Sequence, residues 1–330
     1  MELRKLPPWR PFPSSRGREE PNAPPVFRFA PSPNGELHLG HALSACVGFD
    51  MARARGGRFL LRIEDIDITR CREDLVTRIF EDLRDLGLSW EEPVMRQSER
   101  FATYARASDM LLKLGLLYPC FATRSDIADA TKDTPTRRDP EGAVLYPGLH
   151  KDLPKEEIAA RLARKEPFAL RLHMDRALDS LAEITGTRTV TFTEIDADGQ
   201  PQRVERDPAA WGDAVIVRKD VPASYHLAVV IDDGYQGVTH VTRGRDLFEA
   251  TSLQRLLQIL LGLPEPLYHH HRLVTDAEGR KLSKSDRDTA LRELRAQGMD
   301  TLQIRRLVGL PSAPSAPSAE AEDRASGSGC

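Results

Sequence analysis

Short apolar runs alternate with longer amphipathic stretches over the first third of the chain. The runs VFRFA at 26–30 and RFLLRIED at 58–65 predict two short strands, the second of them buried in a parallel sheet. Between them, LHLGHALSACVGFDMARARGG predicts a helix that ends at Gly56 and Gly57. Apolar residues at helical spacing predict a second helix, namely Leu75, Ile79, Leu83 and Leu86. With a third helix expected from about Ser98 to Leu117, this succession indicates an α/β sheet with right-handed crossovers.

The pattern changes between residues 124 and 215, which are rich in Asp, Arg, Pro and Thr. FALRLHM and TRTVTFTEI predict short strands there, so we expect a smaller α/β piece inserted between two halves of the main sheet. The doubly wound pattern resumes at DAVIVRKD and SYHLAVVIDD. DLFEATSLQRLLQILLGL then predicts a helix ended by Gly262, and LYHHHRLV predicts a last strand. A lysine-containing loop and two short helices are expected to complete the fold.

Composition limits the class of protein only loosely. The chain has 330 residues, 40% hydrophobic and 29% charged, which is an ordinary balance for a folded protein in water. A net charge of -3 does not by itself indicate a nucleic-acid-binding protein, although a local basic face is compatible with it. The 4 cysteines form no Cys-x-x-Cys pair, so we expect a reducing compartment, the cytoplasm. No apolar run is long enough to span a bilayer, and we expect no membrane partner.

The two ends of the chain differ from the rest in composition. The first residues are basic and then proline-rich without the apolar core of a secretory signal, and the last are a Pro/Ala/Ser tract that builds no core. The expected organisation has five parts: a disordered leader (1–25), the first half of a nucleotide-binding domain (26–123), an inserted subdomain (124–210), the second half (211–310) and a disordered tail (311–330).

The stretch PSPNGELHLGH places two histidines at the turn from the first strand to the first helix. Such a turn lies at the carboxyl end of a parallel sheet, where these folds bind ligands, and helix amides there attract phosphate. His38 and His41 lie one turn apart on one helix face, and Gly40 lets a ligand approach the backbone. Two imidazoles in this position suit a phosphate whose charge grows during displacement at phosphorus. Solvated or core histidines are the plain alternative.

A second stretch, GRKLSKS, places Lys281 and Lys284 in a glycine-led loop after the last predicted strand. Alone, two lysines indicate only a solvated charged loop. Together with HLGH they suit nucleotidyl transfer. The imidazoles and helix amides would hold the α-phosphate of ATP, and the lysines would hold the β- and γ-phosphates.

These two stretches resemble the HIGH and KMSKS signatures of the class I aminoacyl-tRNA synthetases. RFAPSPNGELHLGHA, LLRIEDID, SYHLAVVIDD and VTRGRDL resemble the glutamyl branch of the glutamyl/glutaminyl subclass, in matching order over residues 27–310. The resemblance implies a Rossmann-type parallel sheet with an inserted smaller α/β subdomain and a short helical C-terminal part. It implies catalytic roles for His38, His41, Lys281 and Lys284, and an ATP site that includes Gly40, His38, His41 and Lys284.

A full glutamyl-tRNA synthetase continues past this loop into a long helical anticodon-binding domain, whereas two short helices and a low-complexity tail follow here. The chain therefore resembles the glutamyl-Q tRNA(Asp) synthetase family. That resemblance implies activation of L-glutamate with ATP to glutamyl-adenylate without tRNA, and transfer to the queuosine of tRNA(Asp). We also expect Mg²⁺ with ATP, and a monomer. A compact glutamyl-tRNA synthetase charging the 3′ end of tRNA(Glu) and a non-catalytic tRNA-binding paralogue remain alternatives.

Further positions that match the family's motifs are implied to bind glutamate: Arg28, Ala30, Ser32, Glu64, Tyr225 and Arg243. Their chemistry agrees with this role. Two arginines can make bidentate contacts to carboxylates, and Glu64 suits the α-ammonium group. The alternative is a surface ion pair between Arg28 and Glu64. Which arginine meets which carboxylate stays open.

Many family members carry a zinc site with a Cys-x-Cys pair, a tyrosine and a further cysteine. Here Cys120 and Tyr146 remain, while the other positions are Ala122 and His150. A closed zinc site needs four good nitrogen or sulfur donors, so we expect no metal at this degenerate site. The run HHH at 269–271 cannot direct three strand residues at one ion, and for Asp65 and Asp67 local caps and turn bonds are expected.

Overall fold

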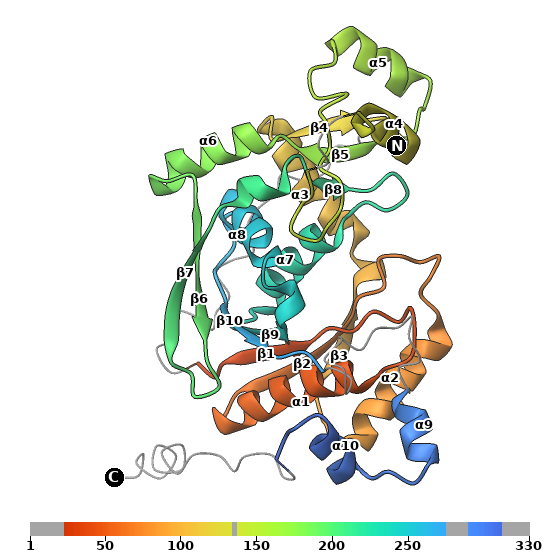
Figure 1. Cartoon of the computed structure of the whole chain (residues 1–330), viewed down its shortest axis with the longest axis vertical. Helices are drawn as coiled ribbons and strands as arrows, with labels where there is room; N and C mark the ends of the chain where they lie inside the picture. The colour runs from red at the N-terminus through yellow and green to blue at the C-terminus, as the bar shows by residue number, and fades with distance from the viewer. Residues whose placement is uncertain (1–22, 134–136, 275–289, 312–330) are drawn as a thin grey trace.

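The computed structural model describes residues 23–133, 137–274 and 290–311. Its main element is a seven-stranded sheet in the order β3-β2-β1-β9-β10-β6-β7, and a second sheet has the order β4-β5-β8. Figure 1 shows the large sheet across the middle of the molecule, with the small sheet at the top. Lys281, Lys284, most of the predicted leader and nearly all of the predicted tail lie outside the described residues.

The first half follows the hydrophobic pattern closely. Its elements are β1 (Val26–Phe29), α1 (Leu39–Ala54), β2 (Arg58–Ile63), α2 (Glu73–Asp85), β3 (Glu91–Arg96) and α3 (Phe101–Lys113). The two predicted strands and the first two helices are confirmed, and β1 pairs with β2 in parallel. The third helix is shorter than predicted at both ends, because a 3-10 turn precedes it and Leu117 already begins a strand. β3 was not predicted, because its sequence EEPVMR lacks a continuous apolar run.

The small sheet is antiparallel and joins three separate parts of the chain. It contains β4 (Leu117–Cys120), β5 (Ala169–Leu172) and β8 (Val215–Val217). Its neighbours in sequence are α4 (Arg124–Thr131), α5 (Lys155–Ala163) and α6 (Met174–Thr185). FALRLHM forms β5 as predicted, whereas DAVIVRKD supplies β8 to this sheet and not to the large one.

One prediction about the insert was wrong. TRTVTFTEI forms a strand, β6 (Val190–Ile195), but that strand belongs to the large sheet, where it pairs in parallel with β10. An antiparallel partner, β7 (Pro201–Arg206), completes the edge. The alternation of apolar and polar residues in VTFTEI predicts a strand with one buried face. It does not predict which of the two sheets that strand joins.

The last elements are α7 (Tyr225–Gln236), β9 (His240–Gly244), α8 (Ala250–Leu260), β10 (Leu267–His271), α9 (Leu291–Ala296) and α10 (Thr301–Leu307). The predicted helix at α8, the strand at β10 and the two short terminal helices are confirmed. All neighbouring pairs from β3 to β6 are parallel, which confirms the α/β parallel sheet.

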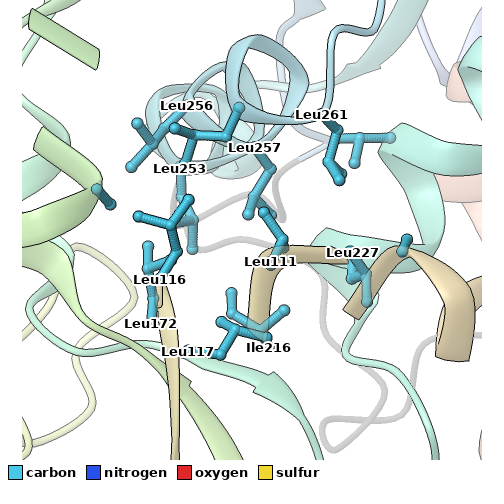
Figure 2. Packing of buried hydrophobic residues seen from close by; sticks show 14 of the residues in the cluster. Leu111, Leu116, Leu117, Leu172, Ile216, Leu227, Leu253, Leu256, Leu257 and Leu261 are labelled. Carbon is cyan, nitrogen blue, oxygen red and sulfur yellow. The ribbon is translucent and has the colours of Figure 1, made fainter. Parts of the chain in front are cut away.

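Helices cover both faces of the large sheet. In Figure 1, α1, α2, α9 and α10 lie below it, and α7 and α8 lie above it. Below, apolar side chains of α1 and α2 pack on Phe27 and Leu61. Above, leucines of α8 meet residues of α3, of α7 and of the small sheet in one continuous core, which Figure 2 shows around Leu253 and Leu257. The small sheet is thereby fixed to the large one.

The strand order changes direction between β1 and β9, which are parallel neighbours although far apart in sequence. From β1 the order runs through β2 to β3, and from β9 it runs through β10 to β6. The loops after β1 and β9 therefore diverge to opposite sides and leave a crevice, the usual ligand position in such sheets. No helix among the described residues is long and apolar enough to cross a membrane.

Candidate active site

The HLGH stretch forms a capped helix start directly after β1. His38 is the N-cap of α1, and its Nδ1 accepts a hydrogen bond of 3.0 Å from the backbone N–H of Gly40. The Nδ1 of His41 accepts from the backbone N–H of His38 at 3.2 Å. Because a ring nitrogen that accepts carries no proton, each neutral imidazole holds its proton on Nε2. The turn thus fixes both tautomers as Nε2–H donors.

Gly40 is required by this arrangement. A Cβ atom at this position would lie 2.9 Å from Cε1 of His38, closer than real contacts allow. The absence of a side chain lets the His38 ring fold over the first turn of the helix. Gly40 therefore serves the geometry of the histidine as well as the approach of a ligand.

A cavity of about 590 Å³ opens at the carboxyl ends of β1 and β9. All predicted site residues that the structure describes line it: Arg28, Ala30, Ser32, His38, Gly40, His41, Glu64, Tyr225 and Arg243. Val274, the last described residue before the KLSKS segment, also lines it, and Ala290, the first described residue after that segment, bridges to His38. Lys281 and Lys284 themselves lie outside the described residues. The structure thus brings together residues that are far apart in sequence.

Arg28 belongs to a buried charge network and not to a surface ion pair. Its Nε donates to Oδ1 of Asp233 at 3.0 Å, and Arg62 donates to the same oxygen at 2.8 Å. Arg62 also donates to Glu64 at 3.1 Å. The predicted alternative, an exposed pair of Arg28 with Glu64, is wrong, because Arg28 is buried and the ion-pair partner of Glu64 is Arg62.

Glu64 stands at the cavity with two opposing influences on its charge. Burial raises the pKa of its carboxyl, while Arg62 and Arg28 act in the opposite direction. The backbone N–H of Glu64 donates to the carbonyl of Pro31 at 2.9 Å, which joins the end of β2 to the loop after β1. Burial outweighs the two arginines and the pKa stays raised, so a further cation such as an ammonium group would favour the ionised form of Glu64.

Arg243 is held on its inner side by three neutral acceptors. Its Nε, Nη1 and Nη2 donate to His270 at 3.0 Å, to Gln254 at 2.7 Å and to Thr251 at 2.7 Å. A guanidinium has five N–H groups, so one remains on each terminal nitrogen. Tyr225, the first residue of α7, lines the same cavity, and burial raises its pKa, which keeps the hydroxyl protonated.

The sequence did not identify several of these supports. Asp233 and His270 were not assigned to the site, although they hold Arg28 and Arg243. Arg62 and Glu194 were not assigned either, although Arg62 donates to Asp233 and Glu194 accepts from His270. The sequence features that could have identified them are the acidic end of SYHLAVVIDD, which contains Asp233, and the middle histidine of HHH, which is His270. Each is a charged or polar group inside an apolar element, which a folded protein buries only with a partner.

The three residues of the degenerate zinc site do lie together, but as a hydrogen-bonded cluster. Nδ1 of His150 accepts from the backbone N–H groups of Phe121 and Ala122 at 3.1 and 3.0 Å. The hydroxyl of Tyr146 accepts from the backbone N–H of His150 at 2.8 Å and also interacts with Cys120. Because Nδ1 of His150 accepts these bonds, the neutral ring holds its proton on Nε2, and neither nitrogen offers a lone pair to a metal. Cys120 and Tyr146 alone do not supply the four donors of a closed zinc site.

Elsewhere in the described part of the chain, no group of three or more His, Cys, Asp or Glu side chains could hold a metal ion. Asp65 accepts from the backbone and hydroxyl of Ser98, and Asp67 from Thr69 and Arg70. The local bonds expected are confirmed for Asp67, whereas the expectation is wrong for Asp65, whose partner Ser98 lies 33 positions along the chain.

Comparison with known proteins agrees with this geometry. Residues 26–317 match the model of the family tRNA synthetases class I (E and Q), catalytic domain. A protein of Rhodobacter capsulatus named glutamyl-Q tRNA(Asp) synthetase is 46% identical over 288 residues, which are 86% of this chain and 100% of that protein. A protein of the same name from Thiobacillus denitrificans is 41% identical, over 86% of this chain and 85% of that protein.

Among solved structures, a glutamate tRNA ligase of Elizabethkingia meningosepticum in complex with its amino acid superimposes with a TM-score of 0.66 and 27% identity. The match covers 90% of this chain and 68% of that one. A methionyl-tRNA synthetase of Mycobacterium tuberculosis, with a TM-score of 0.51 and 12% identity, shares the fold, and the match covers 86% of this chain and 64% of that one. The class I synthetase fold is thus confirmed. The chain belongs to the class I tRNA synthetase family of the E and Q type, and within it to the glutamyl-Q tRNA(Asp) synthetases.

Proposed function

We propose that this ligase activates L-glutamate with ATP, without tRNA, and transfers the glutamyl group to the queuosine of tRNA(Asp). The names of the relatives support the reaction and its substrates. The observation that carries the proposal is the single cavity shared by the HLGH turn, the two arginines and Glu64. One half of that cavity has donors for phosphate, and the other has charges complementary to a dicarboxylic amino acid.

In the activation step, an α-carboxylate oxygen of glutamate attacks the α-phosphorus of ATP. The bond from that phosphorus to the bridging oxygen breaks, and pyrophosphate leaves with the electron pair. His38 and His41 donate Nε2–H groups toward the phosphate, and the amides at the start of α1 add to them. Lys281 and Lys284 neutralise the β- and γ-phosphates. No general base is needed, because the attacking carboxylate is already ionised.

Mg²⁺ accompanies ATP in this proposal. Of the described residues that line the cavity, Glu64 and Asp246 are acidic, and Glu64 is already paired with Arg62. These two side chains do not form a protein cage for Mg²⁺. The ion would be bound mainly by the phosphate oxygens of ATP, as is usual for Mg²⁺ with nucleotides.

Recognition of glutamate is assigned by charge. Arg28 and Arg243 each keep N–H groups beyond their protein contacts, and these take the two carboxylates. Glu64 takes the α-ammonium group, with Tyr225 beside it. Ala30 and Ser32 form the adjoining wall of the cavity. In the transfer step the acceptor group of queuosine attacks the glutamyl carbonyl carbon. The bond from that carbon to the phosphate oxygen breaks, AMP leaves with the electron pair, and the proton of the acceptor group passes to water.

Glutamate-dependent exchange of labelled pyrophosphate into ATP tests the activation step. The full chain is expected to catalyse this exchange without any tRNA, and omission of glutamate is expected to abolish it. Exchange that strictly requires tRNA(Glu) would instead support an ordinary glutamyl-tRNA synthetase. No exchange with or without tRNA would support the non-catalytic alternative.

A further inference from the structure

The inner side of Arg243 contacts the middle residue of the HHH run. His270 is buried on β10, and its Nε2 lies 3.0 Å from Nε of Arg243. Because an arginine side chain only donates, this ring nitrogen must carry a lone pair. The proton of the neutral imidazole therefore resides on Nδ1. Burial and the neighbouring Arg243 lower the pKa of His270 to about 4, while Glu194 acts in the opposite direction, so the neutral form prevails near pH 7.

Glu194, on the adjacent strand β6, fixes that tautomer. Its Oε2 lies 2.8 Å from Nδ1 of His270 and accepts the ring proton. Its Oε1 accepts the backbone N–H of the same histidine at 2.9 Å. One carboxylate thus holds both the ring and the backbone of His270. Its side chain is 16% exposed, so the two bonds are largely shielded from water.

The three residues occupy neighbouring strands of the large sheet, in the order β9, β10, β6. Arg243 on β9 lines the cavity, whereas neither His270 nor Glu194 does. The line of contacts from Glu194 through His270 to Arg243 therefore runs from the interior of the sheet to the site.

We propose that Glu194 and His270 are positioning residues that orient Arg243 toward a carboxylate of glutamate. The inference rests on the proposed function, since it assigns the support for one of its glutamate-binding residues. Free rotation of the guanidinium is prevented at Nε by the histidine, and its two terminal nitrogens keep one N–H each for the ligand. Glu194 acts on glutamate binding without touching the substrate.

The isosteric change Glu194→Gln is the sharpest test. The two donors of His270 face the two different oxygens of Glu194, and the amide keeps an oxygen at only one of these positions, so it cannot accept from both without moving. If the NH₂ group faces the ring, Nδ1 must become the acceptor and the proton moves to Nε2, against the Nε–H of Arg243. If it faces the backbone, two donors oppose each other there. Either arrangement displaces His270 from its contact with Arg243.

Glu265→Gln provides a matched control. Glu265 accepts from the backbone N–H of Thr193 at 3.0 Å and pairs with Arg203 and Arg255, beside the same strand β6 but away from the cavity. A general effect of replacing a partly buried glutamate near β6 should appear in both variants. An effect on Arg243 should appear only in Glu194→Gln.

The experiment measures the Kd of L-glutamate by calorimetry and the KM values of glutamate and ATP in pyrophosphate exchange. For Glu194→Gln we expect glutamate Kd and KM to rise roughly ten- to a hundredfold, the scale of losing a hydrogen bond to a charged group, with ATP KM unchanged. Glu265→Gln should match the wild type in all three. His270→Phe, which removes the acceptor without adding a donor, should repeat the glutamate effect.

Unchanged glutamate binding in Glu194→Gln and His270→Phe, or a parallel loss of ATP and glutamate affinity, would overturn the inference. A wild-type protein that binds no glutamate would overturn it as well. Binding of glutamate without exchange would instead contradict the proposed function alone, because calorimetry does not depend on turnover.

Discussion

Arg28 and Asp233 are 205 positions apart in sequence, yet Nε of the arginine donates to Oδ1 of the aspartate at 3.0 Å. Asp233 also accepts a hydrogen bond from Arg62, so one buried carboxylate holds two guanidinium groups between β1, β2 and α7. Arg28 and Arg62 help keep that carboxylate ionised, since both lower the pKa of Asp233 against the effect of burial. The orientation of Arg28 toward the cavity is thus set by a residue far along the chain.

Arg28→Lys should therefore weaken glutamate binding although it keeps the charge. An ammonium group cannot bond both oxygens of Asp233 side by side and still present donors to a ligand. We expect glutamate KM in pyrophosphate exchange to rise by about tenfold or more, with ATP KM unchanged. Arg58→Lys is the control, because Arg58 on the neighbouring strand makes an exposed ion pair with Glu91, and it should alter neither value. Equal KM values in Arg28→Lys and the wild type would contradict the role of Arg28.

Gly40→Ala should slow activation itself. The added methyl group would lie 2.9 Å from the ring of His38, so the ring must leave its position over the helix start. Loss of one preorganised donor to the phosphate costs about a hundredfold in rate, and we expect a decrease of that order in the exchange rate. A melting temperature close to that of the wild type would establish that the variant is folded. An unchanged rate in such a protein would argue against a role for the HLGH turn.

Asp82 should make stability depend on pH. It is buried on α2, and burial raises the pKa of its carboxyl from 3.8 to about 6, while Arg295 opposes the shift. The folded state then binds a proton that the unfolded state releases, so stability falls as the pH rises from about 4 to about 6. Asp82→Asn should raise the melting temperature by a few degrees at pH 7.5 and have little effect at pH 4. A variant less stable than the wild type at both pH values would contradict this account.

The purified protein should carry no stoichiometric zinc. Hydrogen bonds from two backbone amides to His150, and the contact of Tyr146 with Cys120, hold the turn after β4 without metal. A chelator should therefore leave both the melting temperature and the exchange activity unchanged. About one zinc per chain by elemental analysis, lost together with activity in Cys120→Ser, would show that the cluster binds metal after all.

The sequence predicted the elements where an apolar pattern was long enough, as in α1, β2 and α8. It failed where pairing between distant segments decides the outcome. β3 is polar at its exposed start, and β6 looks the same whichever sheet it joins, so neither could be placed from local pattern. The places of these strands depend on long-range packing, and a hydrophobic period of two or 3.6 residues carries no information about it.

The site shows the same division. Residues such as His38 and Glu64 stand within motifs that resemble those of the family, and both line one cavity. Asp233 on α7, and Glu194 and His270 on strands, act only through partners on other elements, so no spacing along the chain reveals them. A buried charge in an apolar element is the one sign they leave in the sequence.

Transfer of labelled glutamate to purified tRNA tests the central claim most directly. The full chain, with ATP and Mg²⁺, is offered tRNA(Asp) with queuosine, tRNA(Asp) without it, and tRNA(Glu). We predict stable labelling of tRNA(Asp) only when queuosine is present, and no charging of tRNA(Glu). Labelling of tRNA(Glu), or equal labelling of tRNA(Asp) with and without queuosine, would contradict the account.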